Sequence, residues 1–376
     1  MKVFVRDLIM RPAVILGIFC AAAGLSAIPV PTHGQSARPF EMLVVGDSLV
    51  WGQGLEEKDK FYTLFGDWLR KDAFGRPSDV NIKIKAHSGS TAKFHPDEAE
   101  KYKKAGRDET YPFKPEVNVS FPSIFKQIDV AADEYRTVGT SGADLIMLTG
   151  CITDITTSRV YNPKGDDDEL RREVQKYCRD DMYDVIERAA ELNPKALIAV
   201  VGYFPAIGSK SSSKRLLNAW LEALGASGFR KAMLNNPIIR PLFFNKLKKR
   251  AMERSHIWLE ESDKNLRSAV DKLNTKYGTT RAVFIKSPLT LDDATETPNT
   301  KLFRMGKNGV VADPMAKSRI KDCNDALPKL KTETGIDFPI RLCEIAAIGH
   351  PDAAGARAYA ETLKTTLTPH LRLSAQ

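Results

Sequence analysis

The chain has 376 residues, of which 43% are hydrophobic and 27% charged, and its formal net charge is +9. This composition is ordinary for a globular protein and excludes collagen-like, solenoid and low-complexity chains. The length suits one large α/β domain with insertions, or two domains.

The first 37 residues have the layout of a secretory signal peptide, with basic residues ahead of an apolar run at 13–23. A retained membrane anchor is the alternative, but the run is shorter than the roughly 20 apolar residues that a span needs. The bulky Phe19 before Cys20 argues against a lipoprotein. We therefore expect a secreted or periplasmic protein whose folded domain covers residues 38–376.

A short apolar strand at residues 42–45 ends in a turn that carries a candidate nucleophile. Gly46, Asp47 and Ser48 follow the strand directly, and an aromatic-rich helix is predicted over residues 61–69. Open α/β sheets place their ligands at the carboxyl ends of strands, in front of helices. Ser48 is therefore a candidate nucleophile, although the tripeptide alone is also typical of a polar turn.

Strands and helices alternate along the rest of the chain, which predicts a doubly wound, mostly parallel sheet. Further strands are predicted at residues 81–86, 143–149, 195–204 and 282–285. Helical spacing is present at residues 121–135, 170–192 and 351–371. Three stretches lie outside this alternation: a surface insertion at 98–115, a mainly helical insertion at 209–277, and an irregular polar stretch at 290–342.

A serine nucleophile needs a base to take its proton, and the chain has 6 histidines. His350 stands in a loop just before a proline-started helix, where it is well placed to face a cleft. His87 also follows a strand end and is a weaker candidate. The others lie at the signal junction or in charged and helical surroundings: His33, His95, His256 and His370.

Four blocks of sequence, taken in order, resemble those of the SGNH (GDSL) hydrolases. They are the nucleophile block at 46–55, the glycine block at 88–91, the asparagine block at 150–154 and the histidine block at 350–360. The resemblance implies a flavodoxin-like three-layer α/β/α fold and ester hydrolysis through an acyl-serine, without metal or cofactor. It also implies that Ser48 attacks and that His350 is the general base and then the acid. The oxyanion hole would comprise the backbone N–H groups of Ser48 and Gly89 and the side chain of Thr153.

Two positions depart from the family pattern. Thr153 stands where the family has asparagine, and the loss of one oxyanion donor can cost roughly 2.7–4 kcal/mol of barrier. Ala347 stands where an aspartate usually precedes the histidine by three residues. The sequence therefore predicts a serine–histidine dyad, with Glu344, Asp313 or a backbone carbonyl as alternative partners for the imidazole.

Four cysteines remain once Cys20 is assigned to the signal segment, and an even number in an exported protein predicts two disulfides. Four cysteines allow three pairings. We expect Cys151–Cys178 and Cys323–Cys343, because each pair closes a short local loop. Their spacing does not resemble a zinc site.

The positive charge is concentrated between Arg230 and Arg254, which enclose eight basic residues and one acid. Residues 225–254 also contain aromatic and aliphatic side chains. This segment is predicted either to contact an anionic membrane or glycan surface, or to form a helical subdomain that buries its own apolar residues. No nucleic-acid-binding module is present in the sequence.

Together these features predict an exported carboxylic ester hydrolase that acts on lipid, acyl or acetylated-sugar esters. The alternative is a catalytically silent protein that binds a glycan or a lipid with the same cleft. Thr153 and Ala347 motivate this alternative, because each removes a group that the family uses in catalysis.

Overall fold

The computed structural model describes residues 38–109, 113–217, 239–306 and 309–373, and the chain from Pro39 onward is one compact unit. The predicted signal peptide lies outside the described residues and stays a prediction.

Five parallel strands form the central sheet in the order β2-β1-β3-β4-β5. Their bounds are β1 Phe40–Val45, β2 Val80–Ile84, β3 Leu145–Leu148, β4 Leu197–Val201 and β5 Ala282–Ile285. Each overlaps a predicted strand, and the order is that of flavodoxin-like folds. The predicted fold class is therefore confirmed. In such sheets the ligand site lies where the strand order reverses, between β1 and β3.

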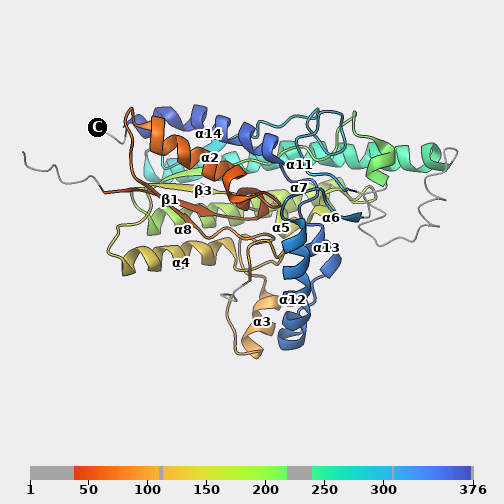
Figure 1. The fold of residues 1–376 in the computed structure, drawn as a ribbon, viewed down its shortest axis with the longest axis horizontal. Coiled ribbons are helices and arrows are strands. Elements are labelled where there is room, and N and C mark those ends of the chain that lie inside the picture. The colour runs from red at the N-terminus through yellow and green to blue at the C-terminus, as the bar shows by residue number, and fades with distance from the viewer. Residues whose placement is uncertain (1–37, 110–112, 218–238, 307–308, 374–376) are drawn as a thin grey trace, which may run out of the picture. The chain divides into compact units, whose positions relative to one another are not determined.

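Helices cover both faces of the sheet (Figure 1). α2 (Phe61–Trp68) and α14 (Ala353–Leu373) pack together on one face. α4 (Ile124–Thr137), α8 (Met182–Leu192) and α11 (Ile239–Tyr277) form the layer on the other face. The connections from β2 to β5 all step in one direction along the sheet, and right-handed crossovers then place their helices on one side.

The predicted helix at residues 170–192 is a continuous run of α7 (Asp167–Val174), the π-helical turn η3 (Gln175–Asp181) and α8. The other helical segments are α1 (Ser48–Trp51), η1 (Glu57–Asp59), η2 (Leu69–Ala73), α3 (Pro96–Lys104), α5 (Ile152–Ile155), α6 (Thr157–Val160), α12 (Ala316–Thr334) and α13 (Ile340–Glu344).

Two stretches that the sequence analysis placed outside the core form a small second core together. It gathers side chains from α3, the segment at 113–121, α12 and α13, and contains an edge-to-face pair of Tyr102 and Phe121 with ring centroids 4.5 Å apart. The prediction of an irregular stretch at 290–342 was wrong for α12. That helix buries Arg319 and Cys323 on its inner face and contains Pro328, so its apolar pattern is weak.

α11 is a single helix of 39 residues. Its C-terminal half buries Trp258, Leu266 and Leu273 in the main core, as expected for the helix that leads into β5. Its N-terminal half packs Phe244 against Leu216 and Leu217. The bounds of the insertion at 209–277 stay a prediction. None of the described helices is long and apolar enough to cross a bilayer.

Candidate active site

Ser48 begins α1 directly beyond the end of β1. Gly46 makes the turn at φ 138°, and a Cβ there would lie 2.5 Å from the carbonyl oxygen of Thr149, so glycine is required. Asp47 caps the helix by accepting from the backbone N–H of Leu49 at 3.0 Å. The cap and the close turn hold Ser48, a buried residue, at the point where the strand order reverses.

His350 lies against Ser48, with 2.7 Å between its Nε2 and the serine Oγ. The two residues are 302 positions apart in the sequence, and the structure brings them together as a hydrogen-bonded pair. The histidine loop is fixed by backbone bonds to one neighbour: Gly349 N–H donates to the Phe303 carbonyl, and Phe303 N–H donates to the His350 carbonyl at 2.8 Å. This geometry is the one that a serine nucleophile and its general base require.

The other imidazole nitrogen of His350 is buried and has no hydrogen-bond partner among the described residues. Ala347 is fully buried, and its methyl side chain offers no acceptor. Both carboxylates proposed for this task are engaged elsewhere: Asp313 with Arg319, and Glu344 with Arg341. The structure therefore contains the predicted contact between Ser48 and His350, neither proposed acid contacts the imidazole, and the catalytic role of the pair stays a prediction.

Burial lowers the pKa of His350 to about 4, and the positive charge of Arg319 acts in the same direction. The neutral imidazole is thus the dominant form well below neutral pH. Because Nε2 faces the serine, Nε2 must be the unprotonated nitrogen when it accepts the hydroxyl proton.

Gly89 stands beside the serine turn with φ 85°. A Cβ at this position would lie 2.5 Å from the Val119 carbonyl oxygen and 2.6 Å from Asn118 Oδ1, so only glycine fits. Within the described residues, neither the Gly89 N–H nor the Ser48 N–H donates to another protein group. The role of these two amides in an oxyanion hole stays a prediction.

Thr153 makes a contact that the sequence did not predict. Its hydroxyl donates to the carbonyl of Ser90 in the glycine loop, so its proton is engaged within the protein, and the oxyanion role stays a prediction. The neighbouring Asp154 accepts from the Ala92 N–H at 3.0 Å. These two residues fasten the loop of Gly89 to α5, which favours a positioning role for Thr153 over an oxyanion role.

This link between α5 and the glycine loop follows from the local backbone. Cys151 adopts φ 99° and turns the chain from β3 straight into α5, which aims Thr153 and Asp154 at the glycine loop. Burial raises the pKa of Asp154 to about 7. The sequence pattern singled out Thr153 but gave no role to Asp154.

A buried polar network lies beneath the serine. Asp47 accepts from the hydroxyls of Thr149 and Tyr203, and the Tyr203 oxygen also accepts from Ile152 N–H at 3.4 Å. Burial raises the pKa of Asp47. Three strand ends, those of β1, β3 and β4, are thereby tied together under Ser48.

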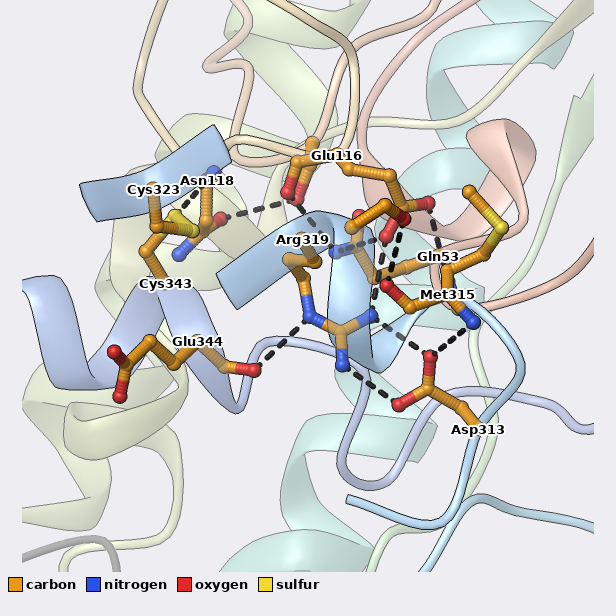
Figure 2. Close-up of polar contacts among 12 residues, drawn as sticks. Gln53, Glu116, Asn118, Asp313, Met315, Arg319, Cys323, Cys343 and Glu344 are labelled. Carbon is orange, nitrogen blue, oxygen red and sulfur yellow. Dashed lines mark hydrogen bonds and ion pairs between the residues drawn. A yellow bond between two sulfur atoms is a disulfide. The ribbon is translucent and has the colours of Figure 1, made fainter. Parts of the chain in front are cut away.

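Close to the site lies a buried charge cluster, which we call the Arg319 cluster: Arg319, Asp313 and Glu116 (Figure 2). Arg319 Nη2 lies 2.6 Å from Asp313 Oδ2, and Nη1 lies 3.1 Å from Glu116 Oε2. Arg319 and Asp313 side chains are 0% exposed, and Glu116 is 5% exposed. No sequence motif indicated this cluster.

Both predicted disulfides are present. Cys151 pairs with Cys178 of η3, and Cys323 of α12 pairs with Cys343 of α13. The first ties the segment that carries Thr153 to the helix layer. Among the described residues, no three His, Cys, Asp or Glu side chains gather as a metal site would require.

The remaining candidates lie away from the pair. His87 is buried, with its Nδ1 3.0 Å from the Ser88 carbonyl oxygen, and burial lowers its pKa to about 4. His256 is exposed beside Glu260. His33 lies outside the described residues.

The basic segment is described only from residue 239 onward. Within it, three cations are committed to internal partners: Lys248 to the Ser209 carbonyl, and Arg250 and Arg254 to Asp167. They are therefore not free to form a basic surface.

The structure is similar to solved structures of ester-hydrolysing enzymes, at low sequence identity. An extracellular lipase from Streptomyces rimosus is 11% identical over 87% of this chain and 99% of its own, with a TM-score of 0.44. Phospholipase A1 from Streptomyces albidoflavus is 11% identical over 88% of this chain and 100% of its own, with a TM-score of 0.42. A family two carbohydrate esterase from Clostridium thermocellum is 10% identical over 90% of this chain and 67% of its own, with a TM-score of 0.39. No family model and no curated protein matches the sequence. The functional assignment therefore rests on the geometry of the chain itself.

Proposed function

We propose that the protein is an exported serine esterase of the SGNH type. The observation that carries the proposal is the 2.7 Å contact between His350 Nε2 and Ser48 Oγ at the carboxyl end of β1. The free N–H groups of Ser48 and Gly89 support it, because acyl transfer needs donors aimed at the tetrahedral oxygen.

In the proposed reaction, the neutral imidazole of His350 accepts the Ser48 proton as Oγ attacks the ester carbonyl. The N–H groups of Ser48 and Gly89 donate to the oxyanion. The imidazolium then returns its proton to the alkoxide as the ester C–O bond breaks, which leaves an acyl-serine. Water attacks this intermediate with His350 again as the base, and the acid and free enzyme are released.

The substrate is an ester of a lipid, a small acyl group or an acetylated sugar. Export is supported by the signal-like residues 1–37 and by two disulfides, which are typical of oxidising compartments. The segment at 225–254 is proposed to contact an anionic membrane or glycan surface. Exposed cations of this segment, such as Lys246 and Lys249, would make the contact.

A fluorophosphonate probe and p-nitrophenyl esters of graded chain length test the proposal. We expect the probe to modify Ser48, and Ser48→Ala and His350→Ala to lose most turnover while they keep the wild-type melting temperature within a few degrees. The exposed Ser158→Ala and His256→Ala serve as matched controls and should retain activity.

The rival function is a silent cleft that binds glycan or lipid, and the unpartnered Nδ1 of His350 favours it. A protein that is neither labelled nor active, yet binds an acylated glycan or a phospholipid vesicle, would replace the esterase by this binder. Labelling at a serine other than Ser48 would instead refute the assignment of the nucleophile.

A further inference from the structure

The proposed catalytic site has three parts: the serine turn at 48–54, the glycine loop at 88–92 and the histidine loop at 344–350. The Arg319 cluster contacts the first and the last directly, and the backbone on either side of Glu116 contacts the glycine loop. The three parts come from different regions of the sequence.

Glu116 holds the serine turn. Its Oε1 accepts from the indole Nε1 of Trp51 at 2.8 Å and from the Gly54 N–H at 3.3 Å. Its Oε2 accepts from the side chain of Gln53 at 3.1 Å and from Arg319. All three donors of the turn lie within six residues of Ser48, so the carboxylate fixes the end of the helix that Ser48 begins.

The segment that carries Glu116 also holds the glycine loop. Ser88 N–H donates to the Pro115 carbonyl at 2.9 Å, and Val119 N–H donates to the Ser88 carbonyl at 3.2 Å. The residue after Ser88 is Gly89, whose N–H is one of the two oxyanion donors. A shift of this segment therefore moves the donor as well as the serine turn.

Arg319 holds the histidine loop. Its Nε donates to the Glu344 carbonyl at 3.0 Å, at the start of the loop that ends in His350. Asp313 accepts hydrogen bonds from the other edge of the guanidinium through both carboxylate oxygens, as Figure 2 shows. The planar fork of arginine suits this three-sided arrangement, whereas lysine offers no such geometry.

We infer that the buried Arg319–Glu116 pair positions the site by holding the serine turn, the glycine loop and the histidine loop in one arrangement. This inference rests on the proposed function for its catalytic consequence. Neither residue touches a reacting atom in the structure, so both act through the groups that they hold.

Arg254 provides a matched control for a purely structural role. It is also a buried helical arginine, 3% exposed, with one aspartate partner, Asp167, and several backbone carbonyl partners. None of these contacts involves the three parts of the site. Both variants remove a buried helical arginine: Arg319→Met leaves two buried carboxylates unpaired, whereas Arg254→Met leaves one, the partly exposed Asp167.

The test compares these two variants in the full exported chain, at a temperature well below both melting points. Steady-state hydrolysis of p-nitrophenyl acetate gives kcat and KM, and fluorophosphonate labelling gives the reactivity of Ser48. We expect Arg319→Met to lower kcat and the labelling rate on the order of 10²-fold, because a displacement of about 1 Å can cost that much. KM should stay within about threefold, and Arg254→Met should remain close to wild type, as expected of a loss confined to orientation.

Glu116→Gln keeps the shape of the side chain and covers the case in which Arg319→Met does not fold. Its amide oxygen can still accept from Trp51, whereas its NH₂ group faces the donors of Arg319 and Gln53. We expect a smaller loss of kcat in the same direction. Arg319→Lys should recover only part of the wild-type rate, since it cannot make the three-sided contact.

Amide hydrogen exchange supplies a readout that does not need activity. Arg319→Met should speed exchange at 48–54, 88–92 and 344–350 together, and Arg254→Met should not. If wild type is neither labelled nor active, the proposed function fails while the exchange pattern still decides the positioning role. Equal kcat in the two arginine variants, or faster exchange confined to α12, would overturn the inference.

Discussion

The acid limb of the pH–rate profile should lie near pH 4, where the pKa of His350 is placed by burial and by the charge of Arg319. A base with a pKa of about 4 is about 90% neutral at pH 5, whereas an unshifted histidine near 6.5 is only about 3% neutral there. At pH 5 the two cases differ by about 30-fold in kcat/KM. The profile therefore separates a buried dyad from an ordinary exposed histidine.

The assay is kcat/KM for p-nitrophenyl acetate from pH 3.5 to 8, read at the isosbestic absorbance of p-nitrophenol, with tryptophan fluorescence to confirm that the chain stays folded. The charged group that lowers the His350 pKa is Arg319 on α12, which pairs with Asp313 and Glu116. Backbone carbonyls of the His350 loop raise the same pKa. Arg319→Met should therefore move the acid limb upward. An acid limb between pH 6 and 7 in wild type would refute the reasoning.

Three further outcomes follow from the contacts around the site. Thr153→Val removes the hydrogen bond to the Ser90 carbonyl, so it should lose about 1 kcal/mol of stability and lower kcat, while Thr153→Ser should keep the wild-type stability and kcat. A Thr153→Val protein with wild-type stability and kcat would contradict the role of Thr153 in holding the glycine loop. Asp154→Asn should gain melting temperature relative to wild type as the pH rises from about 4 to 7, because folded wild type keeps a proton on Asp154 that the unfolded chain releases; calorimetric scans of the two proteins at each pH measure this difference. Cys323→Ser with Cys343→Ser should cost about 2–4 kcal/mol in denaturant unfolding, and a midpoint equal to wild type would contradict a stabilising bridge.

The central sheet and the reacting pair were predictable from sequence because their signals are local. The strand at 42–45 is a continuous apolar run that ends at a glycine, and four short blocks in order are enough to place Ser48 and His350. The disulfides were also predictable, because each closes a short loop. In each case the signal that identifies a residue lies in its own short stretch of sequence, even where, as for Ser48 and His350, the two residues are 302 positions apart.

The parts that sequence reasoning missed are set by contacts between distant segments. Glu116 and Arg319 are 203 residues apart, and an arginine on the inner face of α12 makes the helix look polar. The sequence singled out Thr153, but the direction of its hydroxyl depends on Ser90 in another loop. A buried charged residue has no sequence signature until its partner is known. The roles of the Arg319–Glu116 pair and of Thr153 therefore required the structure.

The absence of an acid at Ala347 has a consistent physical consequence. In a triad, the carboxylate stabilises the imidazolium that forms during attack. Here no described side chain accepts from the Nδ1 of His350, and the nearby positive charge of Arg319 further disfavours the imidazolium. The imidazole therefore stays neutral in acid, but the imidazolium that forms during attack is little stabilised. The site should be slower than a triad at neutral pH and should lose less of its rate as the pH falls. A site with this balance depends strongly on the alignment of its serine, oxyanion donors and histidine. The Arg319 cluster contacts the elements that carry the serine and the histidine, and the backbone beside Glu116 contacts the glycine loop.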